Sequence, residues 1–212
     1  MMRSRYSNLY LTILLIGLYF LLAVIHGYVL IDDSLYFNQF SSEYSYEEIL
    51  DIISNDEQSE LLSFVSIIIY YPLKYFLIAL IIITGLILAE FKVNFASIFR
   101  IVVISDLIFV LEILIRITWF SVFNTDYSLT DLQSFYPLSV YSLFEIDPND
   151  HVLVYVLAKF NLFELAYILL LSFLLYHEIE VSFKRSTVLV LSTYGSGLIL
   201  TILTFSYLII LN

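Results

Sequence analysis

The chain has 212 residues, of which 61% are hydrophobic and only 14% are charged. A soluble domain of this length cannot hide so much apolar surface, so the composition excludes a soluble globular domain and indicates a protein that faces a lipid bilayer. Cysteine is absent, which excludes disulfides, thiol catalysis and cysteine-ligated metals, and the net charge of −11 argues against nucleic acid partners.

Five segments are apolar over the roughly 20 residues that a bilayer-spanning helix needs. The first follows Arg3 and Arg5, but it is too long for the apolar part of a signal peptide and no Ala-x-Ala site follows it, so we expect a retained span. Pro72 predicts a tilt or kink in the second. The sequence therefore predicts an all-α integral membrane protein, a single transmembrane domain over residues 1–212, with spans at about 9–31, 61–89, 98–123, 152–176 and 187–211.

The distribution of basic residues predicts the orientation. Outside the spans, or just inside one, lysine and arginine occur only at the N-terminus and in the second-to-third and fourth-to-fifth connections: Arg3, Arg5, Lys92, Arg100, Lys184 and Arg185. The loops 32–60 and 124–150 hold fourteen acids and no basic residue. We therefore expect the N-terminus inside and both acidic loops and the C-terminus outside. An odd number of spans also argues against a simple inverted-repeat transporter.

Both outer loops contain helical patterns. Ser45 precedes two glutamates and an apolar stripe, which predicts a short amphipathic helix that continues toward the second span. Thr130 and Gln133 have the spacing of a capping box, and residues 147–150 have the composition of a cap for the fourth span. Such loops could dock other membrane or periplasmic proteins, although they could equally be only solvated.

Six charged residues lie deep within the predicted spans, where each charge is costly and needs a reason. They are three cations and three carboxylates: Lys74, Asp106, Glu112, Arg116, Lys159 and Glu164. Residue counts place Lys74 near the midplane and Asp106 about one turn further in. Glu112 and Arg116 are four positions apart and could pair along one helix face. The balanced charge favours an ion-pair network that holds the spans together, and a polar site for an ion, a proton or an anionic substrate is the competing interpretation.

No pattern indicates catalysis, a metal or another cofactor. His-x-x-x-His and Glu-x-x-His spacings are absent, and the lone His26 is more plausibly a hydrogen-bonded interface residue than a ligand. Gly195-Ser196-Gly197 lacks the Gly-x-Ser-x-Gly elbow of hydrolases, so with Ser192 it predicts a small-residue packing face instead. We therefore assign no catalytic, cofactor-binding or metal-binding residue.

Three short stretches resemble the Yip-domain family of membrane proteins. Residues 91–100 are similar to that family's turn into the third span, 160–167 to the opening of its fourth span, and 192–198 to its fifth span. The resemblance implies five spans with the N-terminus inside and the C-terminus outside. The cytosolic arm of eukaryotic members is missing, and the acidic loop 32–60 is not typical of the family, so no role in vesicle traffic is carried over.

The sequence therefore favours a non-enzymatic scaffold or accessory subunit of a membrane or envelope assembly. A composition rich in Ile, Phe, Tyr and Asn suggests a bacterial protein of the cytoplasmic (inner) membrane. The alternative is a small transporter or channel that uses Lys74, Glu112, Arg116, Lys159 and Glu164. An intramembrane enzyme is a third hypothesis, for which no nucleophile–base or metal set is visible.

Overall fold

The computed structural model describes the backbone of residues 2–144, 146–147 and 149–211, and side chains from residue 7 onward in these ranges except at 60 and 61. The described chain is helical, and its one extended pairing is an isolated bridge between Ser139 and Asn161. The prediction of an all-α fold is confirmed. The elements are α1 (Met2–Leu30), α2 (Asp33–Phe40), α3 (Tyr46–Leu88), α4 (Phe95–Ser105), α5 (Leu107–Thr118), the π-helix η1 (Trp119–Phe123), α6 (Leu129–Ser134), the 3₁₀ turn η2 (Tyr141–Leu143), α7 (His151–Lys159), α8 (Leu162–Ile179), α9 (Phe183–Val190), the π-helix η3 (Leu191–Gly195) and α10 (Ser196–Leu211).

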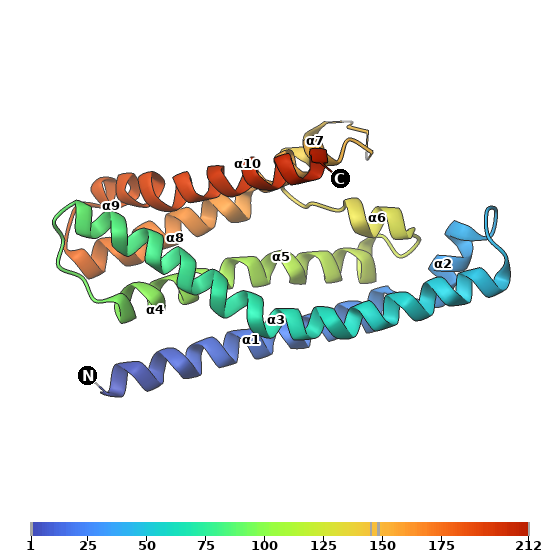
Figure 1. The fold of residues 1–212 in the computed structure, drawn as a ribbon, viewed down its shortest axis with the longest axis horizontal. Coiled ribbons are helices and arrows are strands. Elements are labelled where there is room, and N and C mark those ends of the chain that lie inside the picture. The colour runs from blue at the N-terminus through green and yellow to red at the C-terminus, as the bar shows by residue number, and fades with distance from the viewer. Residues whose placement is uncertain (1, 145, 148, 212) are drawn as a thin grey trace.

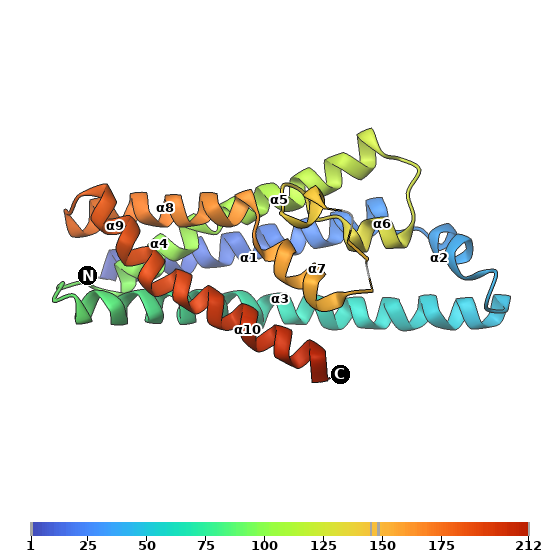
Figure 2. The same cartoon turned by 90° about the horizontal axis from the view of Figure 1, so that it is seen from above.

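The long helices run along one axis of an elongated bundle (Figure 1; Figure 2 shows it turned by 90°). The N-terminus, the α3–α4 turn and the α8–α9 turn lie at one end. These are the connections that carry Lys92, Lys184 and Arg185. At the other end lie α2 and α6, which belong to the acidic loops. Base and acid are thus separated along the long axis of the bundle.

Four helical stretches are long and apolar enough to cross a membrane: Ser7–Leu30, Tyr46–Leu88, Leu162–Ile179 and Phe183–Leu211. They contain or overlap the predicted spans 9–31, 61–89, 152–176 and 187–211. The predicted span 98–123 is not one continuous helix, because α4 ends at Ser105 and α5 begins at Leu107. These two helices and η1 follow one another along the bundle (Figure 1).

The predicted span 152–176 is also wrong as a continuous helix. It is divided into α7 and α8 at Phe160 and Asn161, and α8 runs on to Ile179. Asn161 has the extended backbone of an N-cap, with φ −135° and ψ 166°, and its side chain accepts a hydrogen bond from the Glu164 N–H. An asparagine cap satisfies a free N–H at the start of a helix, so it stabilises a break that the apolar pattern of the sequence does not predict.

The two acidic loops contain helices with defined caps. The helix expected after Ser45 is the start of α3 itself, and Ser45 and Glu48 form a reciprocal capping box there. With 43 residues, α3 is about 65 Å long, roughly twice the thickness of a bilayer core, so one part of it projects beyond the other helices. It contains Pro72 and changes direction near its middle (Figure 1).

Two details of the outer loops differ from the sequence analysis. The capping box of α6 is formed by Ser128 and Asp131 rather than by Thr130 and Gln133, because α6 begins one residue earlier, at Leu129. Asp150 caps α7 by accepting a hydrogen bond of 3.0 Å from the Leu153 N–H. Pro148 of the predicted 147–150 cap and Asn212 of the predicted outer C-terminus lie outside the described residues.

The main core joins α1, α3, α4, α8 and the α9–η3 region, and the side chains of Tyr75 and Tyr167 are fully buried in it. The small-residue face predicted at Ser192, Gly195 and Ser196 is wrong in its position, because Ser192 and Ser196 are exposed. The close approach lies at Gly85 of α3, where an added Cβ would sit 2.0 Å from Cγ2 of Thr193.

The exterior of the bundle is apolar. The described structure exposes 13572 Å², whereas a compact soluble monomer of the same mass exposes about 10,000 Å². Large side chains such as Ile69, Leu88 and Ile210 are 65%, 81% and 69% exposed. Extended apolar surface of this kind is covered by lipid or by protein, which is consistent with an integral membrane protein.

Candidate functional site: a charged cavity inside the bundle

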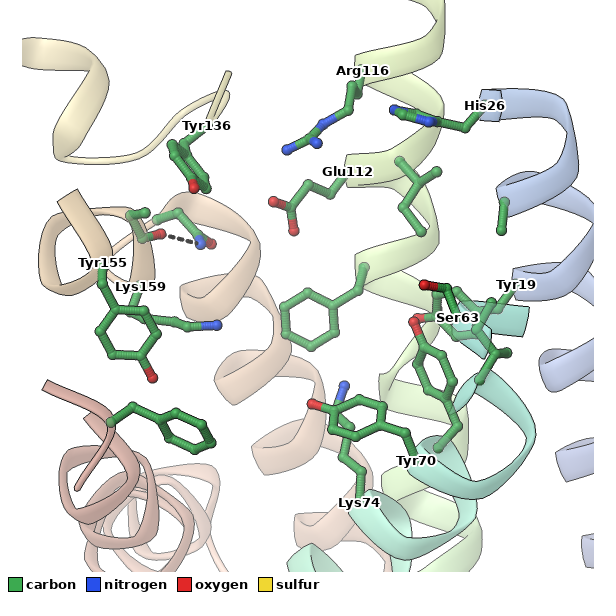
Figure 3. A pocket seen from close by; sticks show the side chains of 18 of the residues that line it. Tyr19, His26, Ser63, Tyr70, Lys74, Glu112, Arg116, Tyr136, Tyr155 and Lys159 are labelled. Carbon is green, nitrogen blue, oxygen red and sulfur yellow. Dashed lines mark hydrogen bonds between the residues drawn. The ribbon is translucent and has the colours of Figure 1, made fainter. Parts of the chain in front are cut away.

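A cavity of about 1330 Å³ lies within the bundle, and residues of α1, α3, α5, α7, α8, η3 and α10 line it (Figure 3). Five of the six charged residues expected inside the spans line this one cavity: Lys74, Glu112, Arg116, Lys159 and Glu164. Asp106 is the exception, because its side chain is fully buried beneath Lys74. Charges that are up to 90 positions apart in the sequence therefore meet in one place.

Asp106 is the best-satisfied charge of the group. One carboxylate oxygen accepts hydrogen bonds from the hydroxyls of Tyr19 at 2.7 Å and Tyr75 at 2.8 Å, and the other accepts one from Lys74 Nζ at 2.6 Å. The donors come from α1 and α3, while Asp106 lies at the α4–α5 junction. A buried carboxylate is tolerated when it is paired and hydrogen-bonded in this way. Asp106 therefore joins three parts of the bundle.

Lys74 connects this buried cluster to the cavity. Its ammonium group lies 4.6 Å from the centre of the Phe109 ring and 5.6 Å from that of Tyr71, and its side chain is 20% exposed. The aromatic faces stabilise the cation in addition to Asp106. The ion pair is compatible with the predicted difference in depth, because a lysine side chain can reach a carboxylate about one helical turn away.

Glu112 and Arg116 point from α5 into the cavity (Figure 3). The pair expected along this helix face does not form: within 4.0 Å, Lys74–Asp106 is the one ion pair between the described side chains. Arg116 instead donates a hydrogen bond of 2.7 Å to the carbonyl oxygen of Phe135, and His26 lies across from it (Figure 3). Glu112 remains directed into the open space, within electrostatic range of Arg116 and Lys159.

The break between α7 and α8 places two further charges. Lys159 is in the last turn of α7 and extends into the cavity from the wall opposite Glu112, with its ammonium group 5.5 Å from the Tyr155 ring centre (Figure 3). Glu164 is in the first turn of α8 and accepts a hydrogen bond from the hydroxyl of Tyr194. In a continuous helix Lys159 and Glu164 would have another orientation relative to each other, so the break determines how both charges face the cavity.

Two hydrogen bonds from residues 138–140 of the acidic loop 124–150 hold the break in place. The Val140 N–H donates to the Phe160 carbonyl at 2.8 Å, and the Leu162 N–H donates to the Leu138 carbonyl at 3.0 Å. These hydrogen bonds, which form the isolated bridge, satisfy backbone groups that the interrupted helix leaves free. In membrane proteins, irregular backbone within the bilayer occurs where it is covered by protein or lines a cavity. This break is hydrogen-bonded to the loop and lines the cavity, so it is compatible with such a position.

The end of the cavity near the acidic loops is itself acidic. Its lining includes Asp33, Asp56 and Glu57, from α2 and from the first part of α3. Tyr36 of α2 donates a hydrogen bond to Asp56, and its ring packs with Ile49 and Ile53 of α3. The first acidic loop therefore forms a structured rim above the deeper charges.

The ion-pair network predicted from the balanced charges is thus confined to Lys74 and Asp106, while the other four charges surround open space. The sequence analysis did not single out Tyr19 and Tyr75, whose hydroxyls donate hydrogen bonds to Asp106. No group of three or more His, Cys, Asp or Glu side chains in the described ranges is placed to hold a metal ion.

Comparisons of the chain with protein-family models, with curated proteins and with solved structures found no match. The resemblance of three short stretches to Yip-domain proteins stays a prediction, and the function is argued from the cavity itself.

Proposed function

We propose that the protein is a small membrane transporter or channel that binds a zwitterionic solute in the cavity. Two cations, Arg116 and Lys159, and two carboxylates, Glu112 and Glu164, line the same cavity without forming ion pairs with one another. That arrangement is the observation that carries the proposal. A solute with one positive and one negative group would complement both pairs.

The energetic cost of these charges supports a functional role. Charged residues at membrane depth are expensive, and those that face an internal cavity commonly mark a path for ions or substrates. A purely structural network would be expected to close its ion pairs, as Lys74 and Asp106 do. The four remaining charges surround a large cavity instead, which is favourable only if water or a ligand occupies it.

The interrupted helix supports the same proposal. Many secondary transporters build their substrate sites from discontinuous helices, whose exposed ends and cap residues line the binding cavity. Here the last turn of α7 supplies Lys159 and the first turn of α8 supplies Glu164. The likeness is one of construction, and it carries no implication about ancestry.

For the topology we propose five crossings with a cytoplasmic N-terminus and an outer C-terminus, in a bacterial inner membrane. The end-to-end course of α4, α5 and η1 supports a crossing in addition to the four long helices, and the segregation of basic and acidic connections supports the orientation. The resemblance of residues 91–100, 160–167 and 192–198 to Yip-domain proteins is compatible with the same topology.

The binding experiment uses the purified full chain in detergent and a panel of soluble probes: glycerophosphoethanolamine and glycine betaine as zwitterions, choline as a cation and glycerol phosphate as an anion. We expect the zwitterions to raise the melting temperature and to enter proteoliposomes that contain the protein. Glu112→Gln and Arg116→Gln should each abolish both effects. Lys184→Gln, on the exposed surface of α9, is the matched control. Folded Glu112 and Arg116 variants that keep the full response would exclude this site.

A scaffold or accessory subunit remains the second candidate, and one observation favours it. Tyr36, Ile49, Ile53 and Leu129 form a separate small core, so α2, the start of α3 and α6 make a folded acidic region that could bind another membrane or periplasmic protein. Tagged purification from native membranes in mild detergent, with mass spectrometry of the co-purifying proteins, tests it. A stoichiometric partner supports the scaffold, and a clean single species contradicts it.

A further inference from the structure

The cavity has two chemically different sides. The deep charges Glu112, Arg116, Lys159 and Glu164 come from α5, from the end of α7 and from the start of α8, whereas the second half of α3 and α10 present mostly apolar side chains to the cavity. Apart from Lys74, α3 from Leu73 onward contributes Leu73, Leu77, Ile78 and Ile81, and α10 contributes Leu198, Ile202 and Phe205. A ligand that fits both sides would carry charges at one end and hydrocarbon at the other.

The apolar side is also part of the outer surface of the bundle. Leu73, Leu77 and Phe205 line the cavity, yet they are 53%, 46% and 51% exposed. The wall of the cavity at these residues is therefore also the outer wall of the bundle, and it is only one side chain thick. Since the exterior of these helices is the surface that faces lipid, displacement of these side chains would open the cavity sideways to the bilayer.

The packing of α3 against the last helical segment shows where this lateral opening begins. Gly85 of α3 contacts Thr193 of η3, and Gly197 of α10 lies against Ile81, so the two segments are in close contact at this level. From there α3 and α10 diverge toward the end that carries α2 and α6 (Figure 1). The opening therefore widens toward the predicted outer side.

The distribution of charge distinguishes the two routes into the cavity. The rim holds Asp33, Asp56 and Glu57, which repel an approaching anionic group, while Arg116 and Lys159 lie deeper. The lateral route begins beside Leu77 of α3, which lies 20 residues along that helix from Glu57, a distance of about 30 Å. A negatively charged group attached to hydrocarbon would reach the deep cations more easily by this route.

We infer that the ligand is a membrane lipid whose headgroup carries a phosphate and an amine, and that it enters the cavity sideways between α3 and α10. The phosphate lies against Arg116 and Lys159, the amine lies against Glu112 and Glu164, and the acyl chains remain along Leu73, Leu77 and Phe205. A cavity of about 1330 Å³ exceeds the size usual for a drug-sized ligand and has room for a headgroup with part of its chains. The inference rests on the proposed zwitterion site and names its substrate class.

The test compares lipids with one soluble headgroup, using the full chain and native mass spectrometry in detergent. The probes are dioleoyl phosphatidylethanolamine, dioleoyl phosphatidylglycerol and free glycerophosphoethanolamine. We expect the ethanolamine lipid to bind at least about tenfold more tightly than the glycerol lipid. Arg116→Gln and Glu112→Gln should each remove this preference, while the control Lys184→Gln retains it. Equal binding of both lipids, unchanged in these variants, indicates surface lipid only and overturns the inference.

Narrowing the lateral opening separates this inference from the proposed function. Leu77→Trp should weaken binding of the ethanolamine lipid at least about tenfold and leave binding of free glycerophosphoethanolamine unchanged. Thr201→Trp, on the α10 side, provides the same test if Leu77→Trp does not fold. If the unmodified protein binds the free headgroup but not the lipid, or if Leu77→Trp leaves lipid binding unchanged, the lipid inference is overturned and the zwitterion site stands. Binding of neither probe contradicts both.

Discussion

Lys74 of α3 donates a hydrogen bond of 2.6 Å to Asp106, which lies between α4 and α5 and 32 positions further along the chain. The carboxylate is fully buried and the lysine is partly exposed to the cavity. The same carboxylate ends one helix and precedes the next, so the break in the predicted third span coincides with the most strongly held charge in the bundle. The cavity and the packing of α1, α3 and α5 therefore depend on one another.

Replacement of Asp106 by Asn should destabilise the protein strongly. It leaves the Lys74 ammonium group without its counter-ion while most of its surface stays buried, and breaking a buried pair in this way costs about 3 kcal/mol or more. We expect a clear fall in the melting temperature in detergent and a lower yield of folded protein. The measurement is a thermal melt followed by intrinsic fluorescence or by loss of the monodisperse species.

The double variant Lys74→Met with Asp106→Asn is the control for this prediction. Removing both charges should recover more than half of the lost stability, because no unpaired charge remains. If the Asp106→Asn variant has the same melting temperature as the unmodified protein, the ion pair does not stabilise the fold.

Tyr19 and Tyr75, which donate hydrogen bonds to Asp106, should each contribute separately to the stability of the folded protein. Tyr19→Phe and Tyr75→Phe each remove one hydroxyl donor to a buried carboxylate, and hydrogen bonds to charged groups contribute about 1.5–3 kcal/mol. Each variant should therefore melt earlier, and the double variant should lose more than either one. Tyr10→Phe, at an exposed position of α1, is the matched control and should be neutral. A loss in the control equal to that in Tyr19→Phe would point to a general effect of the hydroxyl.

Sequence reasoning predicted the helical class, because long apolar segments have few structures available in a bilayer. It also selected the six charged residues, since charge within an apolar run is conspicuous. It missed the breaks at Asp106 and at Phe160–Asn161, because the residues around them, such as Val103 and Leu157, continue the apolar run. Those breaks are stabilised by distant groups, Lys74 and Leu138, and local propensity does not record distant contacts.

The roles of the tyrosines were hidden for a similar reason. Tyr19, Tyr75 and Tyr194 look like the other aromatic residues of the spans, and only the packing shows that their hydroxyls donate to Asp106 and Glu164. One local feature of the sequence bears on this role. Tyr71 and Tyr75 lie within about one helical turn of Lys74, which is a charged residue inside a predicted span.

The start of α3 should depend on pH through Glu48. The Ser45 N–H and hydroxyl each donate a hydrogen bond of 2.8 Å to the Glu48 carboxylate, and these bonds lower its pKa below the usual value of about 4.3. A lowered folded-state pKa stabilises the folded helix end above the usual value, and this contribution is lost as the pH falls through the folded value. We expect the protection of the amides at residues 46–49, measured as exchange relative to the intrinsic rate at each pH, to decrease below about pH 4.

The capping residue and its neighbour provide the control for this pH dependence. Ser45→Ala should raise the pKa of Glu48 toward its usual value and accelerate exchange at residues 46–49 already at neutral pH. Glu47→Gln changes the adjacent carboxylate and should leave the pH dependence as it is. An exchange profile that responds to Glu47→Gln but not to Ser45→Ala would contradict the capping box.

The contact between Gly85 and Thr193 gives the sharpest packing prediction. A Cβ at position 85 would lie 2.0 Å from Cγ2 of Thr193, a distance that no real pair of carbon atoms adopts. Thr193 cannot rotate away freely, because its hydroxyl donates a hydrogen bond of 2.7 Å to the Leu189 carbonyl. Gly85→Ala should therefore separate α3 from η3 and destabilise the protein by about 1–3 kcal/mol, measured as a fall in melting temperature.

A second substitution at the contact tests this explanation directly. Thr193→Ser removes Cγ2 and keeps the hydroxyl, and the remaining Thr193 Cβ would be 3.4 Å from the new atom, which is an ordinary contact. The pair Gly85→Ala with Thr193→Ser should therefore recover most of the stability. Gly17→Ala is the control, because an added Cβ there meets nothing within 4 Å and alanine favours the helix by up to about 1 kcal/mol. If the serine does not rescue Gly85→Ala, the cost lies elsewhere than in the clash with Cγ2.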